Sequence, residues 1–176
     1  MLFRSQLGQG LEVEQGVNLE LVEELGKQPY IKSVLPFVEL QTIMRAGRKG
    51  QQGALVRGIP ENSFTLDKGL QTHLTIEEGS FDVSSANNIV VGAELAYFLG
   101  LSLGDSLSLV SLSGTALENL EAESTMFTVG GIFRSGYYEY DLSWAFISID
   151  RALELYGQGA PITYGVKLNN HLQDNR

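Results

Sequence analysis

Few side chains in this sequence have the types and spacing that catalysis requires. The two histidines, His73 and His171, follow neither the HExxH nor the HxH pattern, and the chain contains no cysteine. Zinc and thiolate sites are therefore not indicated. No GxSxG sequence follows a predicted strand, which argues against a hydrolase with a nucleophile elbow. These residues predict that the chain is not an enzyme and that it binds no cofactor or metal.

Three other groups of residues could bind ligands, but each has a simpler structural interpretation. Residues 47–50, Gly-Arg-Lys-Gly, lack the pattern of a phosphate-binding loop and are typical of a turn. The glutamates of residues 77–78 and 118–123 do not follow EF-hand spacing, so solvated loop acids are expected there. The aromatic run 136–141 could stack sugars or bases. Because no basic residues are interleaved with it, a bulged strand is the simpler interpretation.

The charge of the chain disfavours nucleic acid as a partner. Its 176 residues include 12 basic and 21 acidic residues, giving a formal net charge of -9, and such a field repels nucleic acid and anionic membrane surfaces. The sequence has no apolar run of 18 or more residues, and its first ten residues lack the features of a secretory signal. Two interpretations follow: a cytosolic protein, or a soluble domain of a larger protein.

Hydrophobic periodicity predicts a β-α-β unit near the N-terminus. Asn18 is expected to cap a helix over residues 19–25, whose apolar stripe opposes glutamates. Extended chain follows over residues 31–44, where Pro36 requires an edge position or a bulge. A glycine-rich turn then leads into a strand over residues 54–59, which predicts a hairpin.

The middle of the chain is predicted to be mainly β. Residues 60–88 have an irregular pattern around one short strand near residues 73–76. A helix over residues 93–99 should bury Phe98 on its apolar face, and the strand over 106–110 alternates serine with leucine.

A second β-α-β unit is predicted near the C-terminus. The strand over 126–133 is expected to pair with the strand over 106–110. A strand over 144–149 then precedes a helix that begins after Asp150 and ends at Tyr156, and a strand over 162–168 follows.

These elements predict an α+β fold with two lobes. Residues 1–50 and 126–176 would form a discontinuous α+β lobe from the two β-α-β units. Residues 51–125 would form an inserted, β-rich lobe, from which a hairpin near residues 111–125 protrudes.

The sequence resembles the extracytoplasmic domain of LolC/LolE-type permeases, which belong to the MacB/FtsX-like superfamily. Three stretches carry the resemblance through their order and spacing: residues 37–59, 87–111 and 127–153. The resemblance covers nearly the whole chain and implies a porter-like lobe with an inserted β-rich lobe. It also implies a non-catalytic periplasmic domain of an inner-membrane ABC transporter permease that helps to release outer-membrane lipoproteins.

The resemblance further implies a set of partners. ATP would be hydrolysed by a separate cytoplasmic subunit, and the permease would assemble with a second copy or a paralogue. In LolC-type members a proline-containing hairpin hooks a periplasmic lipoprotein carrier. The corresponding hairpin here has no proline or basic residue, and its candidate contact residues are Leu117, Glu118, Leu120 and Glu121.

Two alternatives remain open from the sequence. A MacB- or FtsX-like permease domain would instead contact an efflux adaptor or an activator of a cell-wall hydrolase. A soluble glycan- or peptide-binding module would use Tyr137, Tyr138 and Tyr140.

Overall fold

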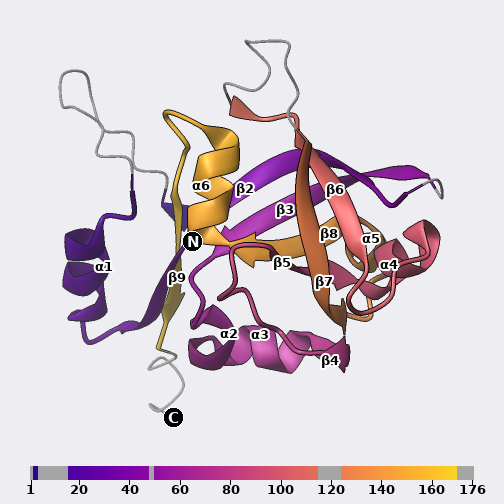
Figure 1. Cartoon of the computed structure of the whole chain (residues 1–176). Coiled ribbons are helices and arrows are strands. Elements are labelled where there is room, and N and C mark those ends of the chain that lie inside the picture. Colours follow the sequence, from indigo (N-terminus) through magenta and orange to yellow (C-terminus); the bar gives the residue numbers. More distant parts are fainter. Residues whose placement is uncertain (1, 4–15, 48–49, 115–123, 170–176) are drawn as a thin grey trace.

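The computed structural model describes residues 2–3, 16–47, 50–114 and 124–169, and it confirms an α+β fold. Within the described residues, no helix is both long enough and apolar enough to pass through a membrane. The strands form one sheet with a closed ring at its centre (Figure 1).

Hydrogen bonding closes six strands of the described chain into this ring, which we call the barrel. In ring order the strands are β2 (Ile31–Arg45), β3 (Gln51–Ile59), β8 (Trp144–Ser148), β5 (Asn88–Gly92), β7 (Ser124–Arg134) and β6 (Ser106–Ser111). Pairing of β6 with the end of β2 completes it. The predicted hairpins between β2 and β3 and between β6 and β7 are confirmed.

Three short strands extend the sheet outside the barrel. β9 (Thr163–Leu168) pairs with the first half of β2, β1 (Leu2–Phe3) pairs with β9, and β4 (Thr75–Gly79) pairs with β7. Up to Phe37, β2 is paired on one edge only among the described strands, because its pairing with β3 begins at Val38. Pro36 therefore lies at an edge, as its missing N–H predicts.

Apolar side chains from all six barrel strands fill one core together with two helices. The helices are α4 (Ala93–Leu99) and α6 (Ile149–Tyr156). Leu40 and Met44 of β2 are fully buried there. Helix α6 lies close to β3 because Gly58 has no side chain: a Cβ at that position would overlap the Cβ of Ala152. Side chains of the described strands thus fill the interior of the barrel.

Local signals explain the helices that the sequence predicted. Asn18 caps α1 (Leu19–Gly26), because its side chain accepts the N–H of Leu21 at 2.9 Å. Helix α4 ends at Gly100, whose φ of +61° favours glycine. Phe98 is an exception to the predicted apolar face, since it is 55% exposed while Leu95 and Leu99 are buried.

Two predictions near the C-terminus are wrong in detail. Residues 136–141 form no bulged strand, because the last four of them belong to helix α5 (Tyr138–Ser143). The carboxylate of Asp141 accepts both the N–H and the hydroxyl of Ser135, at 2.7 Å each, and so holds the preceding turn closed. In addition, Ser148 rather than Asp150 caps α6, because its hydroxyl accepts the N–H of Arg151.

The irregular segment between residues 60 and 88 contains two helices that the sequence did not predict. They are α2 (Ser63–Leu66) and α3 (Lys68–His73), joined at Asp67, and β4 follows them a few residues later than expected.

The barrel draws strands from both predicted lobes. β2, β7 and β8 come mainly from residues 1–50 and 126–176, whereas β3, β5 and β6 come from residues 51–125. The division near residues 50 and 126 stays a prediction.

Candidate functional site

The predicted contact residues of the hairpin, Leu117, Glu118, Leu120 and Glu121, lie outside the described residues. Its base is described and is tied to β2. The N–H of Leu112 donates to the carbonyl of Gln41 at 2.7 Å, and the N–H of Gln41 donates to the hydroxyl of Ser113 at 2.9 Å. A Cβ at Gly114 would overlap the carbonyl of Tyr156 at the end of α6. The base of the hairpin therefore lies where β2, β6 and α6 meet.

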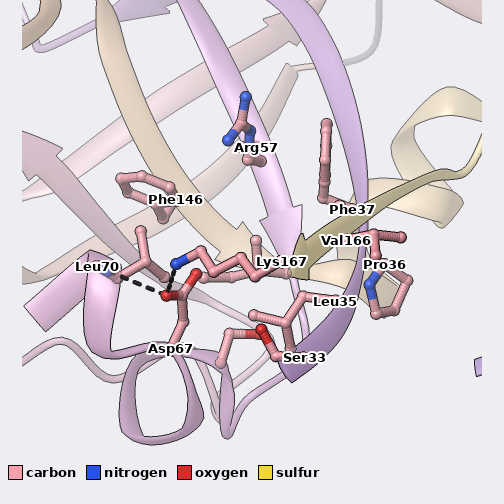
Figure 2. A pocket seen from close by; sticks show the side chains of 13 residues that line it. Ser33, Leu35, Pro36, Phe37, Arg57, Asp67, Leu70, Phe146, Val166 and Lys167 are labelled. Atoms are coloured by element: carbon pink, nitrogen blue, oxygen red, sulfur yellow. Dashed lines mark hydrogen bonds and ion pairs between the residues drawn. The ribbon is translucent and has the colours of Figure 1, made fainter. Parts of the chain in front are cut away.

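A pocket of about 220 Å³ lies on the face of β2, β3 and β9 that points away from the barrel core (Figure 2). Strand β2 contributes Ser33, Leu35, Pro36 and Phe37, and β9 contributes Gly165, Val166 and Lys167. Arg57, Ile59, Ser63, Asp67, Leu70 and Phe146 complete the lining. Most of this wall is apolar, with charged groups at two places.

The first charged group is an ion pair that joins helix α3 to β9. Asp67 caps α3, since its Oδ1 accepts the N–H groups of Gly69 and Leu70 at 2.8 and 3.4 Å. The ammonium of Lys167 donates to the same oxygen. Gly69 makes this approach possible, because a Cβ there would overlap the Lys167 Nζ. The ion pair fixes the two short helices against the sheet.

The second charged place is an aromatic and cationic cluster on the same face of the sheet. The guanidinium of Arg57 lies 4.2 Å from the ring centroid of Phe37 and 4.5 Å from that of Trp144. Its Nη2 donates to Glu39 Oε1 at 2.5 Å, and Tyr140 stacks on Trp144 at 4.4 Å. We call Phe37, Glu39, Arg57, Tyr140 and Trp144 the Arg57 cluster. Burial raises the pKa of the Tyr140 phenol above its ordinary value, and the charge of Arg57 partly opposes that rise.

Ser63 is the unusual polar residue of the pocket wall. It is 1% exposed, and its hydroxyl has no hydrogen-bond partner among the described residues. A buried hydroxyl without a partner is costly in free energy, so such a group calls for a specific explanation.

Other residues considered in the sequence are not brought together. Tyr137 is 74% exposed, whereas Tyr140 is half-buried in the Arg57 cluster, so the predicted tyrosines do not share one environment. His73 is exposed at the end of α3. Glu77 is not simply a solvated acid, since it pairs with Arg134, which also contacts Glu94 at 2.9 Å.

The turn predicted at residues 47–50 is supported by positive φ angles at Gly47 and Gly50. Among the described residues, no group of three or more histidine, aspartate or glutamate side chains could hold a metal ion.

The pocket residues were not identified from the sequence. The alternation of Leu35 and Phe37 with buried neighbours in β2 marks a second, half-buried face, and Arg57 on β3 shares it. That signal could have indicated a partly covered surface. Nothing in the local sequence indicates that Asp67 meets Lys167, because 100 residues separate them.

The chain resembles known proteins in part of their sequence and in fold. No family model matches the chain. The chain is 30% identical over 150 residues to the lipoprotein-releasing system transmembrane protein LolC of Xylella fastidiosa strain Temecula1, a match covering 84% of this chain. It spans only 35% of that relative's length.

Solved structures show the same fold at low sequence identity. The periplasmic region of MacB from Actinobacillus actinomycetemcomitans matches with a TM-score of 0.56 and 18% identity, covering 92% of this chain and 69% of that one. The extracellular domain of the ABC-type transporter YknZ from Gram-positive bacteria matches with a TM-score of 0.59 and 14% identity, covering 91% and 77%. These matches confirm the predicted resemblance: the chain is similar in sequence to part of LolC, and it shares the fold of the periplasmic region of MacB and of the extracellular domain of YknZ.

Proposed function

We propose that this chain is the periplasmic domain of an inner-membrane permease that couples ATP hydrolysis to the release of outer-membrane lipoproteins. The match to LolC over 84% of the chain is the observation that carries the proposal. The domain itself would be non-catalytic, and a separate cytoplasmic subunit would hydrolyse ATP. A second permease subunit, a lipoprotein substrate and a periplasmic carrier would complete the machinery.

The path of β2 through the fold supports a role in transmitting movement. Its first half pairs with β9, which also pairs with β1, so the first and the last described strands are neighbours. Its last residues, Thr42 to Arg45, pair with β6, the strand that leads into the hairpin. A displacement applied at β1 and β9 would therefore reach the hairpin base through one continuous strand in a close-packed core.

The hairpin is the proposed contact with the carrier, although it lacks the proline and basic residues of the LolC-type hook. Leu117 and Leu120 would supply apolar contact area, while Glu118 and Glu121 would favour a partner surface with positive charge.

Reconstitution tests this function. The full-length permease and its ATPase subunit are placed in liposomes with a lipoprotein, and ATP-dependent transfer to the soluble carrier is measured. We expect transfer with the intact permease and its loss when Leu117, Glu118, Leu120 and Glu121 are all changed to alanine. Replacing Glu20 and Glu24 of the exposed helix α1 by alanine removes the same charge and should leave transfer intact. Absence of ATP-dependent transfer with the intact permease would refute the proposal.

The likeness to MacB supports a second candidate. In that case the domain would bind a periplasmic adaptor of an efflux system, and lipoprotein transfer would not occur. Pull-down of the adaptor, but not of the lipoprotein carrier, by the purified chain would favour this alternative.

A further inference from the structure

Four exposed aromatic side chains lie on two neighbouring helices. Tyr97 and Phe98 belong to α4, Tyr137 directly precedes α5, and Tyr138 is its first residue. Their exposed fractions range from 55% at Phe98 to 86% at Tyr97. We call these four residues the aromatic patch. Exposed apolar groups that gather in one region mark interaction surfaces, whereas single ones need no explanation.

Close packing of α4 on α5 brings the two halves of the aromatic patch together. The helices lie side by side, on the opposite side of the barrel from α1 (Figure 1). Gly92, which directly precedes α4, lies so close to α5 that a Cβ there would overlap the carbonyl of Asp141. The rings are therefore carried by two helices in direct contact.

An ion pair ties the same two segments together at the surface. Arg134 donates to Glu94 of α4 at 2.9 Å. Glu94 lies one helical turn before Tyr97 and Phe98, and residues three and four apart share a helix face. Tyr137 follows Arg134 by three residues. The ion pair thus lies between the aromatic residues of α4 and those of α5.

Within the described chain, none of the four rings stacks on another ring or lies under a cation. The Arg57 cluster shows what such rings can bind. There a guanidinium lies over two aromatic rings and also donates to a glutamate, so cation–π contact and ion pairing act on one arginine. The aromatic patch offers exposed rings beside glutamates but no cation over the rings.

The charges beside the aromatic patch favour a cationic partner. Arg134 is bound by two glutamates, Glu77 and Glu94. Glu139, the second residue of α5, is exposed and forms no ion pair with the described chain. A second copy of the chain would bring the same acids and a formal charge of -9 against this surface, and an anionic lipid surface would be repelled as well.

We propose that the aromatic patch binds a segment of another protein that presents arginine or lysine between apolar side chains. The rings cover the apolar side chains, and their faces attract the cations. Glu139 pairs with one of these cations. Arginine is favoured over lysine, because its planar guanidinium stacks on a ring while it donates to a carboxylate.

This surface is distinct from the hairpin that is the proposed contact with the carrier. Strand β7 begins at Ser124, after the hairpin, and ends at Arg134, beside the aromatic patch. At about 3.3 Å per residue, the 11 residues of β7 separate the two surfaces by roughly 35 Å. The inference therefore goes beyond the proposed function and does not depend on what the permease transports.

Three short, fluorescently labelled peptides test the partner chemistry. Each alternates leucine with one other residue, which is arginine, glutamine or glutamate. Fluorescence anisotropy measures their binding to the 176-residue chain at physiological ionic strength. We expect the arginine peptide to bind at least about tenfold more tightly than the glutamine peptide, and the glutamate peptide not to bind. If the arginine peptide does not bind, or binds no more tightly than the glutamine peptide, the proposal is wrong.

Tyrosine variants locate the binding on the aromatic patch. Changing Tyr97, Tyr137 and Tyr138 together to serine should weaken binding of the arginine peptide at least about tenfold, because three ring contacts are lost. The control changes three other exposed apolar residues to serine, on α1, before β2 and on β9: Leu19, Tyr30 and Leu168. Both variants keep the net charge of the chain. Equal affinities of the two variants would overturn the assignment.

A charge variant separates local pairing from attraction by the whole chain. Glu139→Gln should weaken binding of the arginine peptide about threefold, within the range of an exposed ion pair. Glu20→Gln removes the same charge from the exposed surface of α1 and should leave the affinity unchanged. Equal weakening by both substitutions would show that the peptide responds only to net charge, which would refute the proposal.

Two further arms keep the test decisive. If the triple tyrosine variant does not fold, Tyr97→Ser is compared with Tyr30→Ser, and only the former should weaken binding. Cosedimentation with phosphatidylcholine vesicles tests a lipid surface as the alternative occupant. If the native chain sediments with the vesicles and Tyr97→Ser does not, the aromatic patch binds lipid and the proposal is wrong.

Discussion

Thr42 and Ser63 are both buried hydroxyl residues, but they lie on opposite faces of the sheet and in different states. Thr42, 2% exposed in β2, donates to the carbonyl of Ala54 in β3 at 2.9 Å. Ser63, 1% exposed beside the pocket, has no partner among the described residues. Burial alone therefore does not decide whether a hydroxyl is satisfied, since the pairing of β2 with β3 offers Thr42 a carbonyl and no described residue offers one to Ser63. The Nε of Arg151, in helix α6, is likewise buried without a partner among the described residues.

Substitutions of two leucines of β2 should change stability most and so test the difference between the two faces. Leu40 is fully buried in the barrel, and Leu35 is half-buried at the pocket. Leu40→Ala should lower the free energy of unfolding by about 2–5 kcal/mol, because a closed core relaxes little around a new cavity. Leu35→Ala should lower it by no more than about 1.5 kcal/mol, since less area is lost from burial. Urea denaturation measures both values, and equal losses would contradict the distinction between the two faces.

Adding a methyl group at each of two strand glycines tests the same difference between the two faces. A Cβ at Gly58 would overlap Ala152 and lie 3.1 Å from the Ile149 Cα, so Gly58→Ala should cost about 1–3 kcal/mol of stability. At Gly165 the nearest atom would be 3.5 Å away. Gly165→Ala should therefore be neutral or stabilise by up to about 1 kcal/mol. The measurement is thermal unfolding of each variant, and a large loss from Gly165→Ala would show that the pocket face is already closely packed.

The hydroxyls themselves give a smaller effect. Thr42→Val keeps the side-chain shape but removes the hydrogen bond to the Ala54 carbonyl. The free energy of unfolding should therefore fall by about 1 kcal/mol. Ser63→Ala removes a hydroxyl that bonds to nothing described, and stability should stay the same or rise. A loss from Ser63→Ala equal to that from Thr42→Val would mean that the Ser63 hydroxyl has a hydrogen-bond partner in solution.

More of the structure on the barrel face than on the outer face could be predicted from the sequence. Alternating apolar residues predicted β2, β3 and the pairing of β6 with β7, because one fully buried face imposes a period of two on each strand. Capping also identified α1 through Asn18. These signals are local, so one sequence contains them.

The outer face depends on contacts that a local pattern does not encode. Helices α2 and α3 are only 4 and 6 residues long, and Gly69 gives this segment the composition of a loop. Helix α5 was missed because a run of tyrosines favours a strand, while the Asp141 contacts that close its preceding turn depend on the folded chain. The pocket joins residues of β2, α3 and β9 that only the fold brings together. The hairpin contacts, Leu117, Glu118, Leu120 and Glu121, stay a prediction.

The smallest expected effect is the pH dependence of the Arg57 cluster. Burial raises the pKa of Tyr140, so the folded chain holds the phenolic proton more tightly than the unfolded chain does. The stabilising contribution of Tyr140 is therefore complete below the ordinary tyrosine pKa of about 10 and is lost as the pH rises through the higher pKa of the folded state. Urea unfolding at increasing pH should show a steeper loss of stability above pH ~10 in the native sequence than in Tyr140→Phe. Identical slopes would indicate that water reaches Tyr140 freely, and that the outer face is more open at this cluster than at Ser63.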